Sequence, residues 1–143
     1  MSQENVEMVR LLYTPLEEGG YQDIRFEEGP ERVIAEVLDP EFELISLLTT
    51  STGGRSYRGH EGVRAYARDM EDAWEYFLSE IKELHDAGDQ VVAIVHVQAR
   101  GRASGAAVDL YAAHLWTFRD GKAMRMHVYA DAADALEAVG LGE

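Results

Sequence analysis

The chain has 143 residues, 46% of them hydrophobic, with no cysteine and a formal net charge of −14. This length suits a single domain over residues 1–143, and the missing cysteines exclude a disulfide framework and thiolate chemistry. The negative charge disfavours nucleic acids and anionic membranes as partners, and no apolar run is long enough to span a membrane. Because the polar start is unlike a signal peptide, we expect a cytoplasmic protein.

The N-terminal part of the chain predicts helices. A helix over residues 2–17 is expected because Ser2 is a good N-cap and apolar residues recur at helical spacing. Residues 18–30 predict an irregular connection, and Pro30 is well placed to begin a second short helix. Asp39-Pro40 is expected to end that helix. The apolar stripe of the first helix contains Val9, Leu12, Tyr13 and Leu16.

The rest of the chain predicts mainly strands. Apolar and polar residues alternate within several segments, and Gly-containing turns separate the last three, as in antiparallel hairpins. The expected order is strand 42–48, helix 59–75, strand 77–85, strand 90–100, strand 106–119, strand 122–130 and a short helix after Asp131. Helices followed by antiparallel strands is the α+β pattern, with helices packed on one face of a curved sheet.

His114 is the one histidine predicted on the inward face of the last three strands. Neighbours along a strand point to opposite faces, so His114 shares its face with Ala112 and Trp116. A curved apolar sheet with one ionisable group is a usual way to build a small-molecule pocket, so we expect a hydrophobic small molecule as ligand. The residues expected to line the pocket are Leu110, Ala112, Trp116, Met126, Val128, Trp74, Tyr66, Val95 and Val97.

The strand over residues 90–100 is apolar on both of its faces. In a small acidic protein, a strand of this kind indicates that something also covers the outer face of the sheet. A second copy of the chain is the simplest cover, so the sequence predicts a homodimer formed through the outer sheet face.

No metal or cofactor is expected. His96 and His127 share the outward parity and are candidates for adjacent strands, but two imidazoles without a positioned carboxylate fall short of a zinc site. The sequence has no Gly-rich phosphate loop, nucleophile elbow or HExxH motif.

Five stretches of the sequence carry a family resemblance. They are MSQENVEMVRLLY at the start, YRGHEGVRAY (57–66), DAGDQVV (86–92), HLWTFRDGK (114–122) and YADAADALEAVGL (129–141). Together they resemble the SnoaL-like polyketide cyclase family, in order along nearly the whole chain except residues 18–30. The resemblance implies the cystatin-like cone of ketosteroid isomerase and nuclear transport factor 2. In that fold, helices close a curved, mixed and mostly antiparallel sheet around an internal pocket, commonly in a dimer.

The same resemblance implies three site residues. His114 matches the inward position where the isomerases hold a hydrogen-bond donor for the substrate oxygen, and Tyr13 matches their tyrosine for that oxygen. Asp131 matches the aspartate that the cyclases use as general base. The proton-abstracting aspartate of the isomerases falls at about Ile45, which cannot take a proton, while Glu43 has the same parity two residues away.

Each of these residues also suits a purely structural role. Asp131 immediately precedes a helix, so its carboxylate is well placed as an N-cap. His114 and Tyr13 both suit a packed core.

Two functions therefore stay open. The first is a cofactor-free cyclase, isomerase or dehydratase for a hydrophobic carbonyl compound, with Asp131 as base and His114 and Tyr13 orienting the carbonyl. The second is a non-catalytic protein that binds an apolar ligand or serves as a dimeric module. An Asp131 carboxylate directed into the pocket favours the enzyme, and one bonded to the helix amides favours the binding protein.

Overall fold

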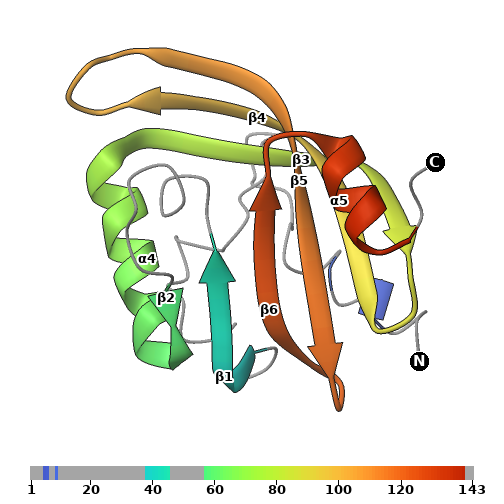
Figure 1. Ribbon diagram of the computed structural model, residues 1–143. Helices are drawn as coiled ribbons and strands as arrows, with labels where there is room; N and C mark the ends of the chain where they lie inside the picture. Colours follow the sequence, from blue (N-terminus) through green and yellow to red (C-terminus); the bar gives the residue numbers. More distant parts are fainter. Residues whose placement is uncertain (1–4, 7–8, 10–37, 46–56, 141–143) are drawn as a thin grey trace.

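The computed structural model describes residues 5–6, 9, 38–45 and 57–140 (Figure 1). In chain order, the elements are β1 Leu38–Ile45, β2 Tyr57–Arg58, α4 Gly59–Ala73, β3 Trp74–Asp86, β4 Gln90–Gly101, β5 Ala107–Arg119, β6 Lys122–Tyr129 and α5 Ala132–Ala138. Residues 5, 6 and 9 of the predicted first helix are helical. The rest of that helix, the 18–30 connection and most of the helix predicted from Pro30 lie outside the described residues.

The strands form one curled, mixed sheet in the order β2-β1-β6-β5-β4-β3. β1 and β6 run parallel, and the other neighbouring strands run antiparallel. α4 packs against β1, β2 and β3, while α5 packs against β4, β5 and β6. The α+β class and the curved, mostly antiparallel sheet are thus confirmed.

β1 begins earlier than the sequence predicts. Asp39-Pro40 is predicted to end a helix, but both residues lie within β1, so that prediction is wrong. This segment is a strand because it pairs with β6, which is distant in the sequence: Leu38 is the Cα partner of Ala123. The Asp39 carboxylate also accepts a hydrogen bond of 2.8 Å from the Glu41 amide, which sets the local turn of the chain at the proline.

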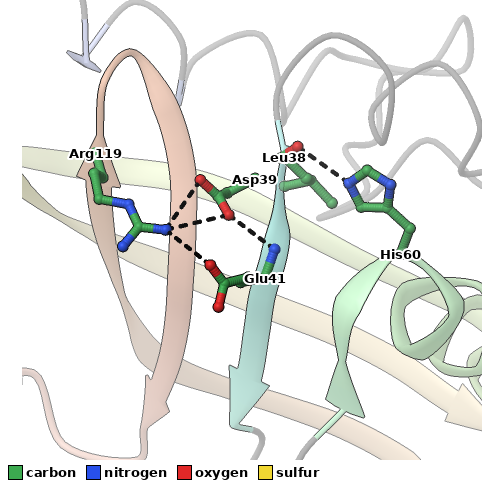
Figure 2. Close-up of polar contacts among 5 residues, drawn as sticks. All are labelled: Leu38, Asp39, Glu41, His60 and Arg119. Atoms are coloured by element: carbon green, nitrogen blue, oxygen red, sulfur yellow. Dashed lines mark hydrogen bonds and ion pairs between the residues drawn. The ribbon is translucent and has the colours of Figure 1, made fainter.

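The start of β1 is tied to the end of β5 by ion pairs (Figure 2). Arg119 Nη2 lies 3.4 Å from Asp39 Oδ2 and 3.5 Å from Glu41 Oε2. On the other side of β1, His60 Nε2 lies 3.2 Å from the carbonyl oxygen of Leu38 and is placed to donate to it. The Glu41 amide, and after it Arg119, hold the pKa of Asp39 below its ordinary value. These contacts fix the edge of the sheet that carries β1.

The sheet has a core on each face. The inner face, which carries α4, holds the larger core, including Phe42, Leu44, Val63, Val91, Ala93, Val95, Val97, Ala112, Trp116 and Met126. The outer face, which carries α5, holds a smaller core of Val92, Ile94, Ala113 and Leu115 against Ala135. The two-sided apolar character of residues 90–100 is therefore explained in part by α5 of the same chain, a cover that the sequence analysis did not foresee.

The hairpin of β4 and β5 extends past the end of β6, at the upper left of Figure 1. β6 pairs only with the part of β5 from Ala113 onward, so residues 107–112 are paired on the β4 side alone among the described strands. Leu110 and Tyr111 on this projecting arm remain 42% and 58% exposed. Together with Tyr76 of β3, these are the large hydrophobic side chains that the described part of the protein exposes to solvent.

Candidate functional site

His114 lies in the middle of β5, between two other strands. Its Cα partners are Ala93 in β4 and Val128 in β6, so the imidazole stands at the centre of the sheet. Ala112 and Trp116, two residues away on either side, are buried in the inner core. Side-chain alternation therefore places His114 on the inner face, as the sequence predicts for this residue.

Burial sets the protonation state of this histidine. His114 is 3% exposed, and the loss of solvation lowers the pKa of its imidazole from 6.5 to about 4. Burial penalises the charged form, so the ring is neutral at pH 7. A neutral imidazole carries one N–H donor and one bare nitrogen acceptor, and can therefore make one hydrogen bond of each kind.

Most residues predicted to line the pocket belong to the core on the inner face, the face that also carries His114. Those buried there are Val95, Val97, Ala112, Trp116, Met126 and Tyr66, with Val128 and Trp74 partly buried beside them. Trp116 also contacts Phe42 of β1, with ring centroids 6.3 Å apart. Leu110 shares the inward parity but lies on the projecting arm, where it keeps 42% of its surface exposed. The chemical character of this face is aliphatic and aromatic, with a single imidazole near its centre.

Asp131 caps α5. Its Oδ1 accepts a hydrogen bond of 2.8 Å from the Ala133 amide, and the carboxylate is exposed. The helix that it begins packs on the outer face, over Ala113 and Leu115. The capping interpretation of Asp131 therefore has direct geometric support. Tyr13, the third residue that the resemblance implies, lies outside the described residues.

Glu43 does not supply a base to the inner face. Phe42 and Leu44, its neighbours in β1, are buried in the inner core, so Glu43 points to the outer face. There it lies 3.2 Å from Arg58 Nη2 and 3.5 Å from Arg125 Nε. The carboxylate is thus held in ion pairs on the side of the sheet away from His114.

The inner face carries a second buried polar side chain that sequence reasoning missed. Ser79 in β3 is 0% exposed, and its hydroxyl oxygen has no hydrogen-bond partner among the described residues. Phe77 and Ile81, at the same parity, pack against the inner core, which places Ser79 on that face. The alternation of Phe77, Ser79 and Ile81 in the sequence is the signal that places Ser79 on this face.

The described residues hold few buried polar groups. They are Asn5, Ser79 and His114, and Asn5 already donates to the carbonyl of Gly88 at 3.1 Å. Every described carboxylate whose side chain can be placed is exposed or only partly buried. No buried carboxylate is therefore found on the described part of the inner face to serve as a general base.

The outward histidines do not form a metal site. His96 in β4 and His127 in β6 are separated by β5, so the expectation that they lie on adjacent strands is wrong. Each stacks on a tyrosine instead, His96 on Tyr111 at 4.7 Å and His127 on Tyr129 at 4.3 Å between ring centroids. No group of three or more potential metal ligands occurs within the described ranges. Among those same ranges, no helix is both long and apolar enough to cross a bilayer.

Comparison with known families identifies the chain. The family model of the SnoaL-like domain matches residues 20–126. The chain belongs to the SnoaL-like family. The match includes His114 and Ser79 and ends before Asp131 and α5. Among curated proteins, no sequence match is found.

Several solved structures share the fold of this chain. A SnoaL-like protein from Jannaschia sp. CCS1 is 21% identical, with a TM-score of 0.71 over 99% of this chain and 94% of that one. An NTF2-like protein from Burkholderia xenovorans LB400 is 18% identical, with a TM-score of 0.70 over 98% of both chains. TerC, crystallised with polyporic acid, is 23% identical, with a TM-score of 0.62 over 79% of this chain and 87% of that one. These likenesses establish the NTF2-like, ketosteroid isomerase-like cone as the fold of this SnoaL-like protein.

Proposed function

We propose that this SnoaL-like protein binds a small, largely apolar molecule on the inner face of its sheet, with neutral His114 as the hydrogen-bonding anchor. The observation that carries the proposal is the burial of this imidazole in an aliphatic and aromatic wall, which lowers its pKa to about 4. Such a wall supplies affinity through apolar area, and one convergent polar group supplies orientation.

The composition of the wall supports an apolar, ring-containing ligand. Trp116, Phe42 and Met126 surround the centre of the inner face, and flat rings pack well against such side chains. TerC, a protein of the same fold, was crystallised with polyporic acid, an aromatic small molecule, which gives this ligand class a precedent within the fold.

Binding without catalysis fits the described residues better than an aldol cyclase or an isomerase does. A base for such chemistry must reach the carbon acid on the inner face. Asp131 is occupied as the cap of α5, and Glu43 is paired with two arginines on the outer face. A cofactor-free reaction with Asp131 as base is therefore the less favoured alternative.

The proposal is tested by titrating the protein with 4-hydroxybiphenyl and with biphenyl by calorimetry. The chain has two tryptophans, so a Trp74→Phe variant leaves Trp116 as the sole reporter of the inner face. We expect both probes to bind and to change the emission of Trp116. His114→Phe should weaken 4-hydroxybiphenyl about tenfold and leave biphenyl unaffected, because one hydrogen bond is lost. Probes that do not bind, or that leave Trp116 unchanged, contradict the proposal.

A homodimer through the outer face is the second part of the proposal. α5 packs on Ala113 and Leu115, while Tyr111, which stacks on His96, is 58% exposed on the same face. Tyrosine is enriched at the centres of interfaces between proteins. Analytical ultracentrifugation at micromolar concentration should show a dimer that Tyr111→Lys dissociates. The dimer should tighten as salt rises, since each chain carries a net charge of −14. A monomer under all salt conditions would rule out the interface.

A further inference from the structure

Ser79 carries a hydroxyl group that no described residue satisfies. Its side chain is 0% exposed, its hydroxyl has no hydrogen-bond partner, and its Cα partner across the strands is Val97. A buried hydroxyl without a partner is less stable than an alanine of similar shape in the same place. An unsatisfied group of this kind in a wall proposed to bind a ligand therefore indicates a missing external partner.

We propose that Ser79 is the second polar anchor for the ligand that His114 holds. The ligand is then an elongated, rigid and largely apolar molecule with a hydrogen-bonding group at each end. This inference rests on the proposed binding function and adds to it the length and the polarity pattern of the ligand. A hydroxyl can both donate and accept a hydrogen bond, so either a phenol or a ketone group suits the Ser79 end of the ligand.

The strand register gives the spacing of the two anchors. Ser79 is level with Val97 in β4, and His114 is level with Ala93 in the same strand, so the anchors stand on either side of β4. Their Cα atoms are offset by four residues along the strand direction, about 13 Å, and by two strand spacings across the sheet, about 10 Å. The distance between the two Cα atoms is the diagonal of these two offsets. After allowance for the side chains and two hydrogen bonds, a ligand with polar atoms about 10 Å apart reaches both. Two linked aromatic rings have this length.

The wall between the anchors suits such a molecule. Val95 and Ala112 are a cross-strand pair on the inner face between the two anchors, and both are small aliphatic residues. Phe77 and Ile81, which flank Ser79 in β3, are partly buried apolar residues packed against the same core. The chain thus places an apolar track between two polar ends.

The test compares 4,4′-dihydroxybiphenyl, with a hydroxyl at each end, and 4-hydroxybiphenyl, with one. We expect the diphenol to bind the wild type more tightly than the monophenol. Ser79→Ala should weaken the diphenol about tenfold and bring it to the affinity of the monophenol, which should itself be unchanged. The unliganded Ser79→Ala protein should melt at the same temperature as the wild type or higher, because an unsatisfied hydroxyl has been removed.

A matched serine-to-alanine change is available in the turn between β4 and β5. The Ser104 hydroxyl accepts a hydrogen bond of 3.1 Å from the Ala106 amide, so Ser104→Ala should melt at a lower temperature and leave both affinities unchanged. Equal affinities of the diphenol for wild type and Ser79→Ala would overturn the role of Ser79 while leaving the binding function intact. A lower melting temperature for Ser79→Ala would show that the hydroxyl is satisfied within the protein, which also overturns it. If neither phenol binds, the proposed function fails and this inference fails with it.

Discussion

His114 and Leu115 are neighbours in β5, yet their side chains are buried on opposite faces of the sheet. Leu115 packs beneath α5 in the outer core, while His114 lies beside Trp116 on the face that α4 covers. Asp131 belongs to the outer side, because it begins the helix that packs on Leu115. The pairing of an aspartate base with this imidazole, which the family resemblance implies, is therefore not what the described geometry favours.

The stability of the protein should depend on pH through His114. The pKa of this imidazole is 6.5 in a model peptide and about 4 when folded, so the unfolded chain takes up the proton first as the pH falls. The contribution of the neutral ring is fully present above pH 6.5 and is lost between pH 6.5 and about 4. The loss amounts to about 3 kcal/mol. Urea unfolding of the wild type and His114→Gln across this range measures it as the difference between the two curves.

The difference between the two curves cancels the contribution of carboxylates that titrate in both proteins. These include Asp39 and Asp109, whose pKa values are lowered by their hydrogen-bond partners. Parallel stability curves for the wild type and His114→Gln would mean that the imidazole is solvated, contrary to its burial.

Asp131 should behave as a helix cap. Asp131→Ala should lower the free energy of unfolding by about 1 kcal/mol, because the Ala133 amide loses its acceptor. Asp131→Asn should be nearly neutral in stability, since asparagine caps as well as aspartate does. Neither change should alter the binding of 4-hydroxybiphenyl. A loss of turnover in Asp131→Asn, on any substrate found and at unchanged stability, would restore this residue as a catalytic base.

Gly62 should be intolerant of a side chain. A Cβ at this position of α4 would lie 2.9 Å from the carbonyl carbon of Tyr57, which is backbone and cannot move aside cheaply. Gly62→Ala should therefore destabilise the protein by about 1–3 kcal/mol, although alanine favours a helix. Thermal unfolding measures the change, with exposed Arg68→Ala in the same helix as the control. A stability gain in Gly62→Ala would show that α4 does not lie so close to β2.

At the start of β1, the hydrogen bond from the Glu41 amide to Asp39 should contribute more to stability than the ion pairs of Arg119 do. Asp39→Ala removes both the contact with Arg119 and the acceptor of the Glu41 amide, whereas Arg119→Gln removes only the ion pairs. Exposed ion pairs contribute little, so Asp39→Ala should destabilise the protein more than Arg119→Gln does. Chemical denaturation ranks the two variants. The reverse order would place the stabilisation in the ion pairs and not in the local turn.

Local patterns in the sequence are enough to predict the last strands of the sheet and the face to which their side chains point. Alternation along residues 106–119 placed His114 and Trp116 on one face, and the Gly-containing turns separated the last strands correctly. The start of β1 was missed because Asp39-Pro40 resembles a helix end, and only the parallel pairing with β6 makes it a strand. Alternation shows that a face is apolar but not which element covers it. The sequence therefore predicts a second chain over residues 90–100 and does not reveal that α5 of the same chain covers part of that face.

The candidate site was predicted in part for a related reason. The inward parity of His114 can be read from β5 alone, whereas the ion pairs that hold Glu43 on the outer face depend on the register of β1 against β2 and β6. The sequence pattern does not reveal that the Ser79 hydroxyl lacks a hydrogen-bond partner among the described residues, because this depends on which atoms surround it in three dimensions.

Nitrogen-15 NMR of the His114 imidazole, with and without saturating 4-hydroxybiphenyl at pH 7, tests the account most directly. We predict a neutral ring in the free protein and a clear change in the shift of one ring nitrogen when the phenol binds. A charged ring in the free protein, or ring nitrogens that do not respond to a bound phenol, would contradict the claim that this buried imidazole anchors a ligand.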